Sequence, residues 1–445
     1  MKATIGSLML TVALLFGGAD RAAALQDFPL PTGDAGLIDA NQGPHFGNRG
    51  IISWRGSLWF AEEDANKIGV ATTGGQISEV TIPSAISEPE YGPFALSAVR
   101  NDQFWFAADG APLEGRVVRL SPELNSNYWN LGYNKLLAIV ADPAGGAWVT
   151  YDDGEGISYY DNDNVEHYFE EPQYLDPGPI TVGGDGAAWF GDGSSTIKRI
   201  TKSGSLTNYH ASGDGDITSI TTGPDGSVWY SKFNPGYGIF GPPASGGVIG
   251  RMTLSGSPKL FEPPVDDLLP SSLIAGPDGA IWFTTGFGEG IGRVTPAGRY
   301  SLINMPGGRT ADSIAFGPDG ALWYTDSRLN RIGRMTIPEF NRATAARKPQ
   351  ILSRSLRANR RGVAKLRIAC PVGPYPCHGN IAVAAGRKAI GKGWYSLPIG
   401  KTRSFAVRLN GPGKKLLRRK KTLAVKVTLK PANAKPVSRK MKLRR

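Results

Sequence analysis

The stretch GPDGALWYTDSRLNRIGRMT spans residues 317–336, and a close copy, GPDGAIWFTTGFGEGIGRVT, spans residues 276–295. Each copy holds an Asp-Gly pair, a strand-like run around one Trp, a loop, and a second strand-like run with the sequence Ile-Gly-Arg. An Asp-Gly pair between two apolar runs is typical of a tight β-hairpin turn. These two stretches therefore predict antiparallel hairpins that belong to a repeat.

The Trp of this stretch recurs along most of the chain at a nearly constant interval. Seven segments share it: GSLWFAE (56–62), DQFWFAA (102–108), GGAWVTY (145–151), GAAWFGD (186–192), GSVWYSK (226–232), GAIWFTT (279–285) and GALWYTD (320–326). Successive Trp are 46, 43, 41, 40, 53 and 41 residues apart. A period near forty residues with several strands per repeat is typical of a β-propeller blade. We expect the Trp side chains, and the arginines of Ile-Gly-Arg, to have structural roles.

The fourth strand of each repeat indicates how the ring closes. Six repeats end in such a strand pattern, for example LTNYHAS (206–212), but the last repeat runs into NRATAARKPQ (341–350) instead. A matching segment, LQDFPLP (25–31), stands near the start of the chain. We expect this segment to supply the outer strand of the last blade, which would protect the sheet edge and close a ring of seven blades.

The composition agrees with an all-β protein. Of 445 residues, 59 are Gly and 33 are Pro, hydrophobic residues make up 40%, and 10 residues are Trp. So many turn residues exclude long helices as the main element, and the hydrophobic content is too high for a mostly disordered chain. Many short strands joined by tight turns fit these values.

Charge divides the chain into two parts. Residues 341–445 hold 29 Lys and Arg and no Asp or Glu, so the preceding residues hold 50 − 29 = 21 basic and 38 acidic ones, a net charge of −17. Such an asymmetry marks a domain boundary and suggests different partners for the two parts. Strand-like alternation, as in TLAVKVTL (422–429), predicts a small basic β-sandwich in the second part. We expect the propeller over 25–338, a basic linker over 339–360 and the sandwich over 361–445.

The first 24 residues predict a signal peptide (1–24) and export. Lys2 precedes an apolar run over 5–16, and the small residues that end at Ala24 suit cleavage by signal peptidase. The run is shorter than the roughly 20 apolar residues that span a bilayer. An uncleaved anchor is the alternative. We expect the mature protein to be secreted or associated with the cell envelope.

Export also bears on the two cysteines. An exported protein meets an oxidising compartment, so Cys370 and Cys377 are expected to form a disulfide. The alternative is metal binding together with His378, which would be one ligand short of a closed zinc site.

The propeller geometry predicts where functional side chains gather. The start of each innermost strand and the end of the next strand must lie on one face of the ring, because the hairpin turn between them lies on the other. The acidity of that face has two interpretations: solvated loop charge that keeps the protein soluble, or a site for Mg²⁺, Ca²⁺ or a cationic ligand. For such a site we single out Asp312, Asp326 and Glu62. The residues expected to face a small-molecule or peptide ligand are Arg49, Tyr151, Asp192 and Lys232.

The GPDG turn, the Trp strand and the Ile-Gly-Arg strand together resemble the blade motif of the virginiamycin B lyase family, over roughly residues 25–338. Members of that family are seven-bladed propellers that open a cyclic depsipeptide antibiotic at its ester linkage by elimination, with Mg²⁺. The resemblance implies a histidine base at the start of an innermost strand. It also implies a glutamate and a second histidine that hold the metal.

Carried over residue by residue, the resemblance places Asp312 at the position of the base and Ser271 where the second histidine would stand. It places Asp326 and Glu62 at acidic metal positions. None of the seven strand starts in this chain is a histidine. If the chain is an enzyme, the resemblance implies a Mg²⁺-dependent carbon–oxygen lyase in which a carboxylate replaces the base.

The runs KKLLRRKK (414–421) and SRKMKLRR (438–445) would give the second part a strong positive field. For an exported protein the expected partners are anionic polymers of the cell envelope or acidic lipid headgroups, with extracellular DNA as a further polyanion. Aromatic residues are few here, which argues against base stacking and against sequence-specific nucleic-acid binding. Docking on the acidic propeller is the alternative.

Three hypotheses for function follow from the sequence. The first is a lyase-like enzyme that acts on an ester or cyclic peptide. The second is a propeller that binds a ligand on its acidic face while the basic region anchors it to the envelope. The third is an interaction protein whose propeller docks another protein.

Overall fold

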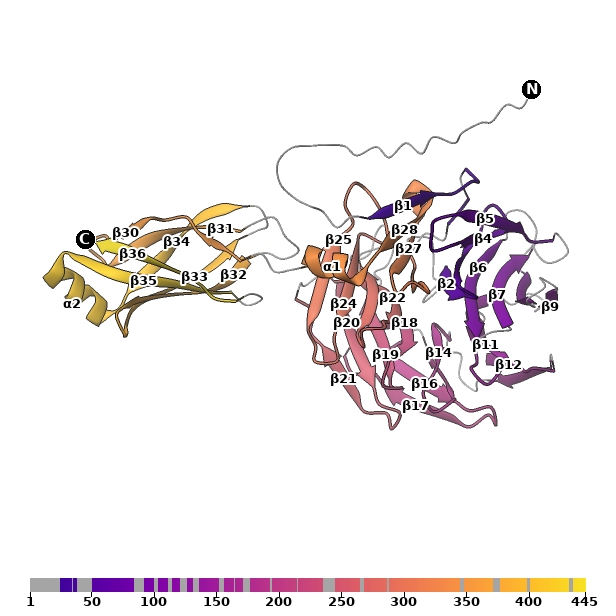
Figure 1. Ribbon diagram of the computed structural model, residues 1–445. Coiled ribbons are helices and arrows are strands. Elements are labelled where there is room, and N and C mark those ends of the chain that lie inside the picture. The colour runs from indigo at the N-terminus through magenta and orange to yellow at the C-terminus, as the bar shows by residue number, and fades with distance from the viewer. Residues whose placement is uncertain are drawn as a thin grey trace, which may run out of the picture.

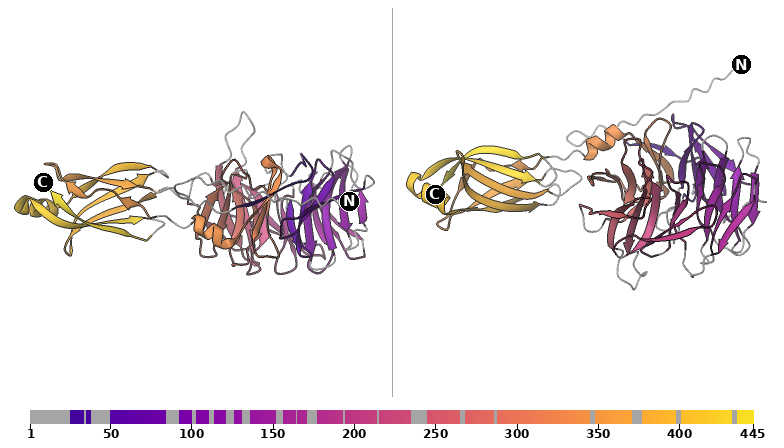
Figure 2. Two further views of the ribbon diagram at one scale, coloured as in Figure 1. Left: turned by 45° about the horizontal axis from the view of Figure 1, so that its top comes forward. Right: turned by 90° about the horizontal axis from the view of Figure 1, so that it is seen from below.

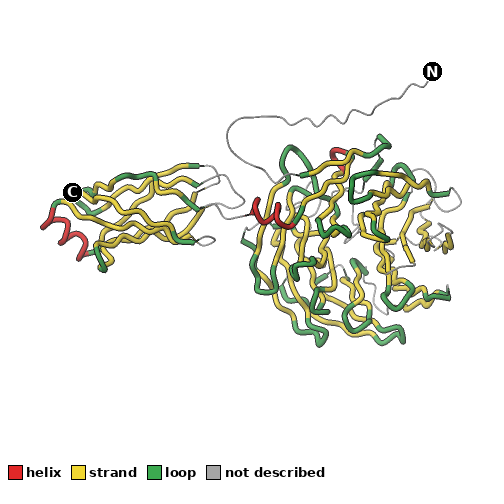
Figure 3. Tube along the Cα trace, in the orientation of Figure 1, coloured by secondary structure: helices red, strands yellow, loops and turns green. Residues whose placement is uncertain are grey.

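Figure 1 shows the computed structural model, in which strands dominate and helices are few (Figure 3). The structure describes residues 25–33, 35–37, 50–83, 92–99, 103–110, 114–120, 126–130, 136–151, 156–163, 165–170, 177–192, 194–213, 215–234, 245–264, 268–285, 288–344, 348–370, 377–397, 401–431 and 435–445. The expected signal peptide and Arg49 lie outside these ranges. Among the helices within them, none is long and apolar enough to cross a membrane.

Seven four-stranded antiparallel sheets, the blades, surround one axis (Figures 1 and 2). The first three blades consist of β2 (Ile51–Trp54), β3 (Ser57–Glu62), β4 (Lys67–Ala71) and β5 (Ile77–Thr81); β6 (Pro93–Val99), β7 (Gln103–Gly110), β8 (Glu114–Leu120) and β9 (Ser126–Asn130); β10 (Leu136–Ala141), β11 (Ala147–Tyr151), β12 (Gly156–Tyr160) and β13 (Glu166–Glu170). The next three consist of β14 (Ile180–Val182), β15 (Ala188–Gly191), β16 (Thr196–Ile200) and β17 (Leu206–His210); β18 (Asp216–Thr222), β19 (Val228–Asn234), β20 (Ser245–Met252) and β21 (Pro258–Phe261); β22 (Pro270–Ala275), β23 (Ile281–Thr285), β24 (Gly290–Val294) and β25 (Tyr300–Asn304). The seventh consists of β26 (Ile314–Phe316), β27 (Leu322–Asp326), β28 (Arg331–Met335) and β1 (Gln26–Pro29).

The innermost strand of each blade contacts the innermost strand of the next, and β26 contacts β2, so the ring is closed. Hydroxyl groups on these strands link neighbouring blades. Ser97 Oγ accepts a hydrogen bond from the backbone N–H of Ala141 at 2.8 Å, and Ser219 Oγ accepts one from Leu273 at 3.0 Å. The prediction of a seven-bladed propeller is confirmed.

The seventh blade is completed by the start of the chain, as the sequence predicts. Strand β1 pairs antiparallel with β28, so that Phe28 lies opposite Ile332. The Phe28 ring stacks on Trp323 with centroids 5.4 Å apart. Tyr209 stacks in the same way on Trp189 in the fourth blade, at 5.2 Å. The N-terminal strand therefore supplies both the backbone pairing and the aromatic contact that an ordinary outer strand supplies.

In three blades the turn aspartate, the Trp and an arginine of the third strand form one polar unit. In the seventh blade Asp319 Oδ1 accepts a hydrogen bond from Trp323 Nε1 at 3.1 Å, and its Oδ2 accepts one from Arg334 Nε at 2.7 Å. The Arg334 guanidinium lies 5.8 Å from the centre of the Trp323 ring, in the range of a cation–π contact. The corresponding residues in the fourth and sixth blades are Asp185, Trp189 and Arg199, and Asp278, Trp282 and Arg293. These Trp and Arg side chains are structural, as expected.

A curled eight-stranded sheet follows the propeller and forms a sandwich-like domain. Its order is β29-β31-β34-β33-β32-β35-β36-β30. Its strands are β29 (Gln350–Ile351), β30 (Ser355–Arg357), β31 (Val363–Ala369), β32 (Cys377–Ala385), β33 (Lys388–Leu397), β34 (Thr402–Leu409), β35 (Thr422–Pro431) and β36 (Val437–Arg444). Apolar side chains of alternate residues, such as Leu366, Val407 and Val427, are buried in one core. Cys370 and Cys377 are joined by a disulfide.

This domain differs from the sequence-based expectation at its start. Strands β29 and β30 lie inside the segment expected to be a linker (339–360), and each pairs with a strand of the sheet. That segment also contains most of α1 (Ile337–Thr344), whose Phe340 ring lies 4.4 Å from Trp282 of the propeller. The sequence analysis assigned these residues to a basic linker because of their charge. Charge composition carries no information on strand pairing.

The run KKLLRRKK forms most of a helix, α2 (Gly411–Lys420), which the sequence analysis did not predict. Asn410 caps the helix by accepting a hydrogen bond from the backbone N–H of Gly413 at 2.8 Å, and Pro412 stands in its first turn. Both are ordinary start signals of a helix. Leu417 is buried against the sheet, whereas most of the cations face solvent.

We expect replacement of Phe28 by alanine to weaken ring closure. The stacked contact on Trp323 would be lost from a half-buried site, which should lower the free energy of unfolding by about 2 kcal/mol. Thermal unfolding measures the change. Leu206→Ala removes an exposed apolar side chain from the outer strand of an internal blade and serves as the control. Equal melting temperatures for Phe28→Ala and the control would contradict this role of β1.

Candidate functional site

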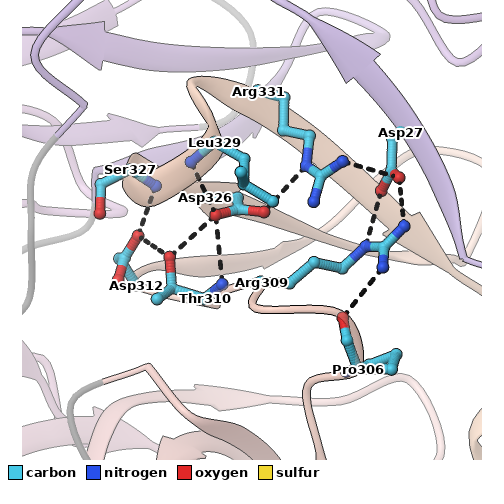
Figure 4. Close-up of polar contacts among 9 residues, drawn as sticks. All are labelled: Asp27, Pro306, Arg309, Thr310, Asp312, Asp326, Ser327, Leu329 and Arg331. Atoms are coloured by element: carbon cyan, nitrogen blue, oxygen red, sulfur yellow. Dashed lines mark hydrogen bonds and ion pairs between the residues drawn. The ribbon is translucent and has the colours of Figure 1, made fainter.

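Two of the predicted residues meet where β26 begins and β27 ends, in the seventh blade (Figure 4). The hydroxyl of Thr310 lies 2.9 Å from Asp312 Oδ2 and 3.0 Å from Asp326 Oδ1. The backbone N–H of Ser327 donates a hydrogen bond to Asp312 Oδ2 at 2.7 Å. Both carboxylates are buried, with 5% of Asp312 and 0% of Asp326 exposed. The structure therefore places these two residues in one cluster.

Asp326 accepts hydrogen bonds from several donors of its own blade. Its Oδ1 accepts from the backbone N–H of Thr310 at 3.1 Å and of Leu329 at 3.2 Å, and in this way it caps the short 3₁₀ helix η2 (Ser327–Leu329). Its Oδ2 accepts from Arg331 Nε at 2.8 Å. These bonds order the loop after β27 and neutralise the buried charge.

Arg331 also joins Asp326 to the N-terminal strand. Its Nη1 donates to Asp27 Oδ2 at 3.0 Å, and Arg309 Nη2 donates to the same oxygen at 2.6 Å. The hydrogen bond with Asp27 is the main cause that raises the pKa of Arg309, against the opposing effect of burial. We call Asp27, Arg309, Asp326 and Arg331 the ring-closing cluster (Figure 4). The sequence analysis did not find Asp27, Arg309 or Arg331, because they belong to no motif for a functional site.

The first blade has charged residues at the equivalent positions, but its cation forms a different ion pair. Glu62 lies opposite Lys67 on the next strand, as Asp326 lies opposite Arg331. Glu79 lies opposite Gly69, as Asp27 lies opposite Gly333. Lys67 Nζ contacts Glu79 Oε2 at 2.7 Å and Thr32 Oγ1 at 2.6 Å.

Glu62 is consequently an unusual carboxyl group. It is 0% exposed, and neither of its carboxylate oxygens has a hydrogen-bond partner among the described residues. Its pKa is raised to about 7, mainly by burial and to a lesser extent by the charge of Glu79, while Lys67 acts in the opposite direction. Glu79 differs: burial favours a higher pKa, but hydrogen bonds from Lys67 and Thr32 outweigh it and hold the pKa below the usual value.

Tyr151 and Ser271 contact their own blades. The Tyr151 hydroxyl donates to Glu166 Oε1 on the outer strand β13 at 3.4 Å, and it lies 3.5 Å from the hydroxyl of Tyr160. Ser271 is half-buried and stands at a break in the register of β22 and β23. Its neighbour Ser272 accepts a hydrogen bond from the backbone N–H of Ile314 at 3.4 Å, so it is Ser272 that links the sixth and seventh blades.

Asp192 and Lys232 lie between the fourth and fifth blades. The Lys232 ammonium is buried and donates to the carbonyl oxygen of Ser212 at 2.9 Å and to Ser195 Oγ at 3.2 Å. Asp192 Oδ1 accepts from the hydroxyl of Ser194 at 2.5 Å. Both charged groups thus bind neighbouring loops of the protein.

The sequence analysis also missed a cavity. A space of about 330 Å³ is lined by Val140, Thr181, Thr222 and Ile274, among others. These residues belong to the innermost strands of four consecutive blades, at the ends where the hairpin turns begin. The cavity therefore opens on the face opposite the one predicted. Its lining of aliphatic and hydroxyl side chains carries no charge, so no charged motif could have indicated it.

Residues 84–236 and 240–349 match the model of the virginiamycin B lyase family. The chain belongs to this family. A streptogramin B lyase structure shares 26% of its residues with the chain, with a TM-score of 0.57 over 70% of this chain and 97% of that one. The virginiamycin B lyase of Staphylococcus aureus shares 24%, with a TM-score of 0.57 over 70% and 99%. A catalytically inactive form of that lyase with quinupristin shares 24%, with a TM-score of 0.56 over the same shares. No curated protein sequence matches the chain.

Membership in the virginiamycin B lyase family raises the question of whether these residues fit a magnesium ion. Mg²⁺ takes six oxygen ligands, among them ionised carboxylates and several waters. In the seventh blade Asp326 already accepts hydrogen bonds from protein N–H groups and from the Arg331 guanidinium. Among the described residues, no group of three or more His, Cys, Asp or Glu side chains could hold a metal ion. The residues at this position do not fit Mg²⁺ or Ca²⁺.

Glu62 predicts a measurable pH dependence of stability. Its pKa is about 7 in the folded protein, against an ordinary value of 4.5, so the unfolded chain loses this proton first as the pH rises. Stability should therefore fall between about pH 4.5 and 7 and change little above that range. Glu62→Gln removes this loss and should raise the free energy of unfolding at pH 8 by roughly 2–3 kcal/mol, with little effect at pH 4.5.

Thermal unfolding of both proteins across this pH range tests the prediction. Glu79→Gln is the matched control, because the pKa of Glu79 is lowered and its ionised form stabilises the fold. This control should reduce stability at pH 8. A Glu62→Gln variant that is less stable than the parent at pH 8 would contradict the assignment.

Proposed function

We propose that this chain is an exported member of the virginiamycin B lyase family that binds an anionic polymer of the cell envelope through its C-terminal sheet. We also propose that its propeller binds ligands without carrying out the lyase reaction. The observation that carries the proposal is the arrangement of cations on the outer surface of β30, β36 and β35. We call this surface the basic face; its residues are Arg357, Lys426, Lys440, Lys442 and Arg444.

The basic face follows from the alternation of buried and exposed side chains along the strands. In β36 Met441 and Leu443 are buried, while Lys440 and Lys442 are exposed. In β35 Val425 and Val427 are buried, while Lys426 is exposed. A side-chain period of two places these apolar groups in the core and these cations outside. The side chains on the outer surface therefore take no part in the packing of the core.

On the basic face, cations of neighbouring strands lie directly across from one another and not across from acidic side chains. Lys426 lies directly across from Lys440, and Arg357 directly across from Arg444. Like charges in such positions destabilise a sheet by roughly 0.2–1 kcal/mol per pair. Since residues 341–445 contain no Asp or Glu, no acidic side chain of this domain can relieve the repulsion. A bound polyanion would relieve it, which supports the proposed partner.

Two observations support export. The sequence of residues 1–24 has the charge, the apolar run and the small residues of a signal peptide. Cys370 and Cys377 form a disulfide, and structural disulfides are rare in reducing compartments. Both agree with a location outside the cytoplasm, where envelope polymers are found.

The ring-closing cluster supports a propeller that binds ligands without the family's chemistry. Asp326, at an acidic metal position of the family, is bonded to Arg331. Asp312, at the position of the family's base, accepts a hydrogen bond from the backbone of Ser327. A small-molecule or peptide ligand would instead fit the uncharged axial cavity, whose volume of about 330 Å³ is at the lower end of the range for ligand pockets.

We expect the purified protein to leave quinupristin intact in the presence of Mg²⁺. Chromatographic separation of the linear product from the cyclic antibiotic measures the reaction, and a virginiamycin B lyase serves as the positive control. Ring opening by this protein that is abolished in Asp312→Asn would overturn the proposal and establish the lyase function with Asp312 as its base.

We expect Lys426→Glu to weaken polyanion binding and at the same time to stabilise the domain. The new carboxylate would lie opposite Lys440, which should raise the free energy of unfolding by about 0.2–1 kcal/mol. Affinity for polyglutamate, measured by titration calorimetry at low salt, should fall at least fivefold. Because exposed charges are screened by salt, the affinity of the parent protein should also fall as salt is added.

Lys365→Glu is the matched control for this variant. Lys365 is exposed on β31 and lies opposite Ala406 rather than opposite a cation. The same change of net charge there should reduce affinity less than twofold. Equal losses in the two variants would mean that binding depends on net charge alone and would contradict a defined basic face.

A further inference from the structure

Trp394 is the one exposed residue among the tryptophans whose burial the structure describes. Six of the seven blade Trp are fully buried, whereas Trp394 in β33 is 61% exposed. Its strand neighbours Tyr395 and Leu397 are buried, so the backbone direction places the indole on the outer surface of the sheet. An exposed Trp offers a large, rigid apolar surface with one N–H donor, a combination that is common at binding sites.

The residues around Trp394 are polar and basic. Trp394 lies directly opposite Asn380 of β32, and Asn380 lies opposite Lys430 of β35. Lys392, two residues earlier on β33, shares its face and lies opposite Arg408 of β34. One aromatic ring is thus surrounded by three cations and one amide on the same side of the sheet.

This surface is continuous with the basic face. Strand β32 lies between β33 and β35 and presents the short side chains of Ala382 and Ala384 on the outside. Ala384 lies opposite Lys426, the first residue of the basic face on this side. A track of short side chains therefore runs between the longer side chains of β33 and β35, with cations on both sides and Trp394 at one end.

We propose that this track, with Trp394, Lys392, Asn380 and Lys430, binds an anionic polysaccharide. The flat apolar face of a sugar ring stacks on an indole, the carboxylate of an acidic sugar pairs with a lysine, and an amide hydrogen-bonds to sugar hydroxyls. The inference rests on the proposed function and deepens it, because it selects sugar-based polyanions from among the polymers of the envelope.

The same surface fits a lipid bilayer less well. Proteins that lie on membranes insert a group of apolar side chains between the headgroups, with cations around it. Among the described residues after the propeller, the large apolar side chains that are exposed are Trp394 and, less so, Leu352. Lys392 and Asn380 adjoin Trp394 where further apolar groups would be needed. The surroundings of the indole therefore favour a sugar polymer over a membrane.

The test compares polyanions of similar charge with and without sugar rings. Titration calorimetry at low salt would measure the affinity of the full chain for polygalacturonate and for polyglutamate. Trp394→Ala should weaken binding of polygalacturonate at least tenfold and change binding of polyglutamate less than twofold. Trp394→Tyr should restore much of the lost affinity, because a phenol ring also stacks on sugars. Unchanged thermal unfolding would show that the exposed substitution leaves the fold intact.

Three results would overturn the inference, and they can be told apart. If Trp394→Ala weakened binding of neither polymer, or of both polymers equally, the sugar ring would have no role in binding. The proposed polyanion binding would still stand. Binding to vesicles of acidic phospholipid that depends on Trp394, without such dependence for polygalacturonate, would assign the surface to a membrane. If the parent protein binds neither polymer, the proposed function falls together with the inference.

Discussion

The propeller depends on one noncovalent seam, the pairing of β1 with β28. A ring of blades must join its first and last members without a chemical bond between them, and here a four-residue strand does so across about 300 positions of sequence. The entropy lost in closing so long a loop grows only with the logarithm of its length. A short strand can therefore hold the ring if side chains add to its backbone bonds. Phe28 adds an aromatic contact with Trp323, and Asp27 adds ion pairs with Arg309 and Arg331.

The seam includes Asp326, one of the residues that the sequence analysis expected to hold a metal. A guanidinium presents a planar fork of donors, so Arg331 can bond to Asp326 through one nitrogen and to Asp27 through another. The ammonium of Lys67 is a single point charge, and at the equivalent place it pairs with Glu79. That difference explains why one buried carboxyl is part of the ring-closing cluster while Glu62 keeps a raised pKa. The fold of the family is thus retained while these positions serve its closure.

The sequence predicts this fold well because its signals are local and repeated. Each Asp-Gly turn and each Trp defines a hairpin by itself, and seven Trp segments separated by about forty to fifty residues give the number of blades. The site is harder to predict, because a side chain's partner depends on the register of strands that are distant in sequence. Asp312 and Asp326 could be placed together, since one hairpin separates them. Asp27 could not be added to them, because only the pairing of β1 with β28 brings it near. The eight-stranded sheet shows the same limit: β30 pairs with β36, which lies some 80 residues further along the chain.

The two parts of the chain use their charged residues in opposite ways. In the propeller, Asp27, Asp319 and Asp326 are bonded to arginines that close the ring or fix a Trp, so changing them for a new function would cost stability. In the eight-stranded sheet the apolar core and the Cys370–Cys377 disulfide stabilise the fold, and the cations of the basic face stand on the other side of the strands. Repulsion between Lys426 and Lys440 costs far less than the burial of one of the apolar side chains beneath them, which stabilises a fold by about 1.5–3 kcal/mol. A sheet with such a core tolerates an outer surface whose charges are all positive. The residues of that surface can then change to suit a ligand with little loss of stability. A surface for the proposed polyanion would therefore cost the sheet less stability than it would cost the ring.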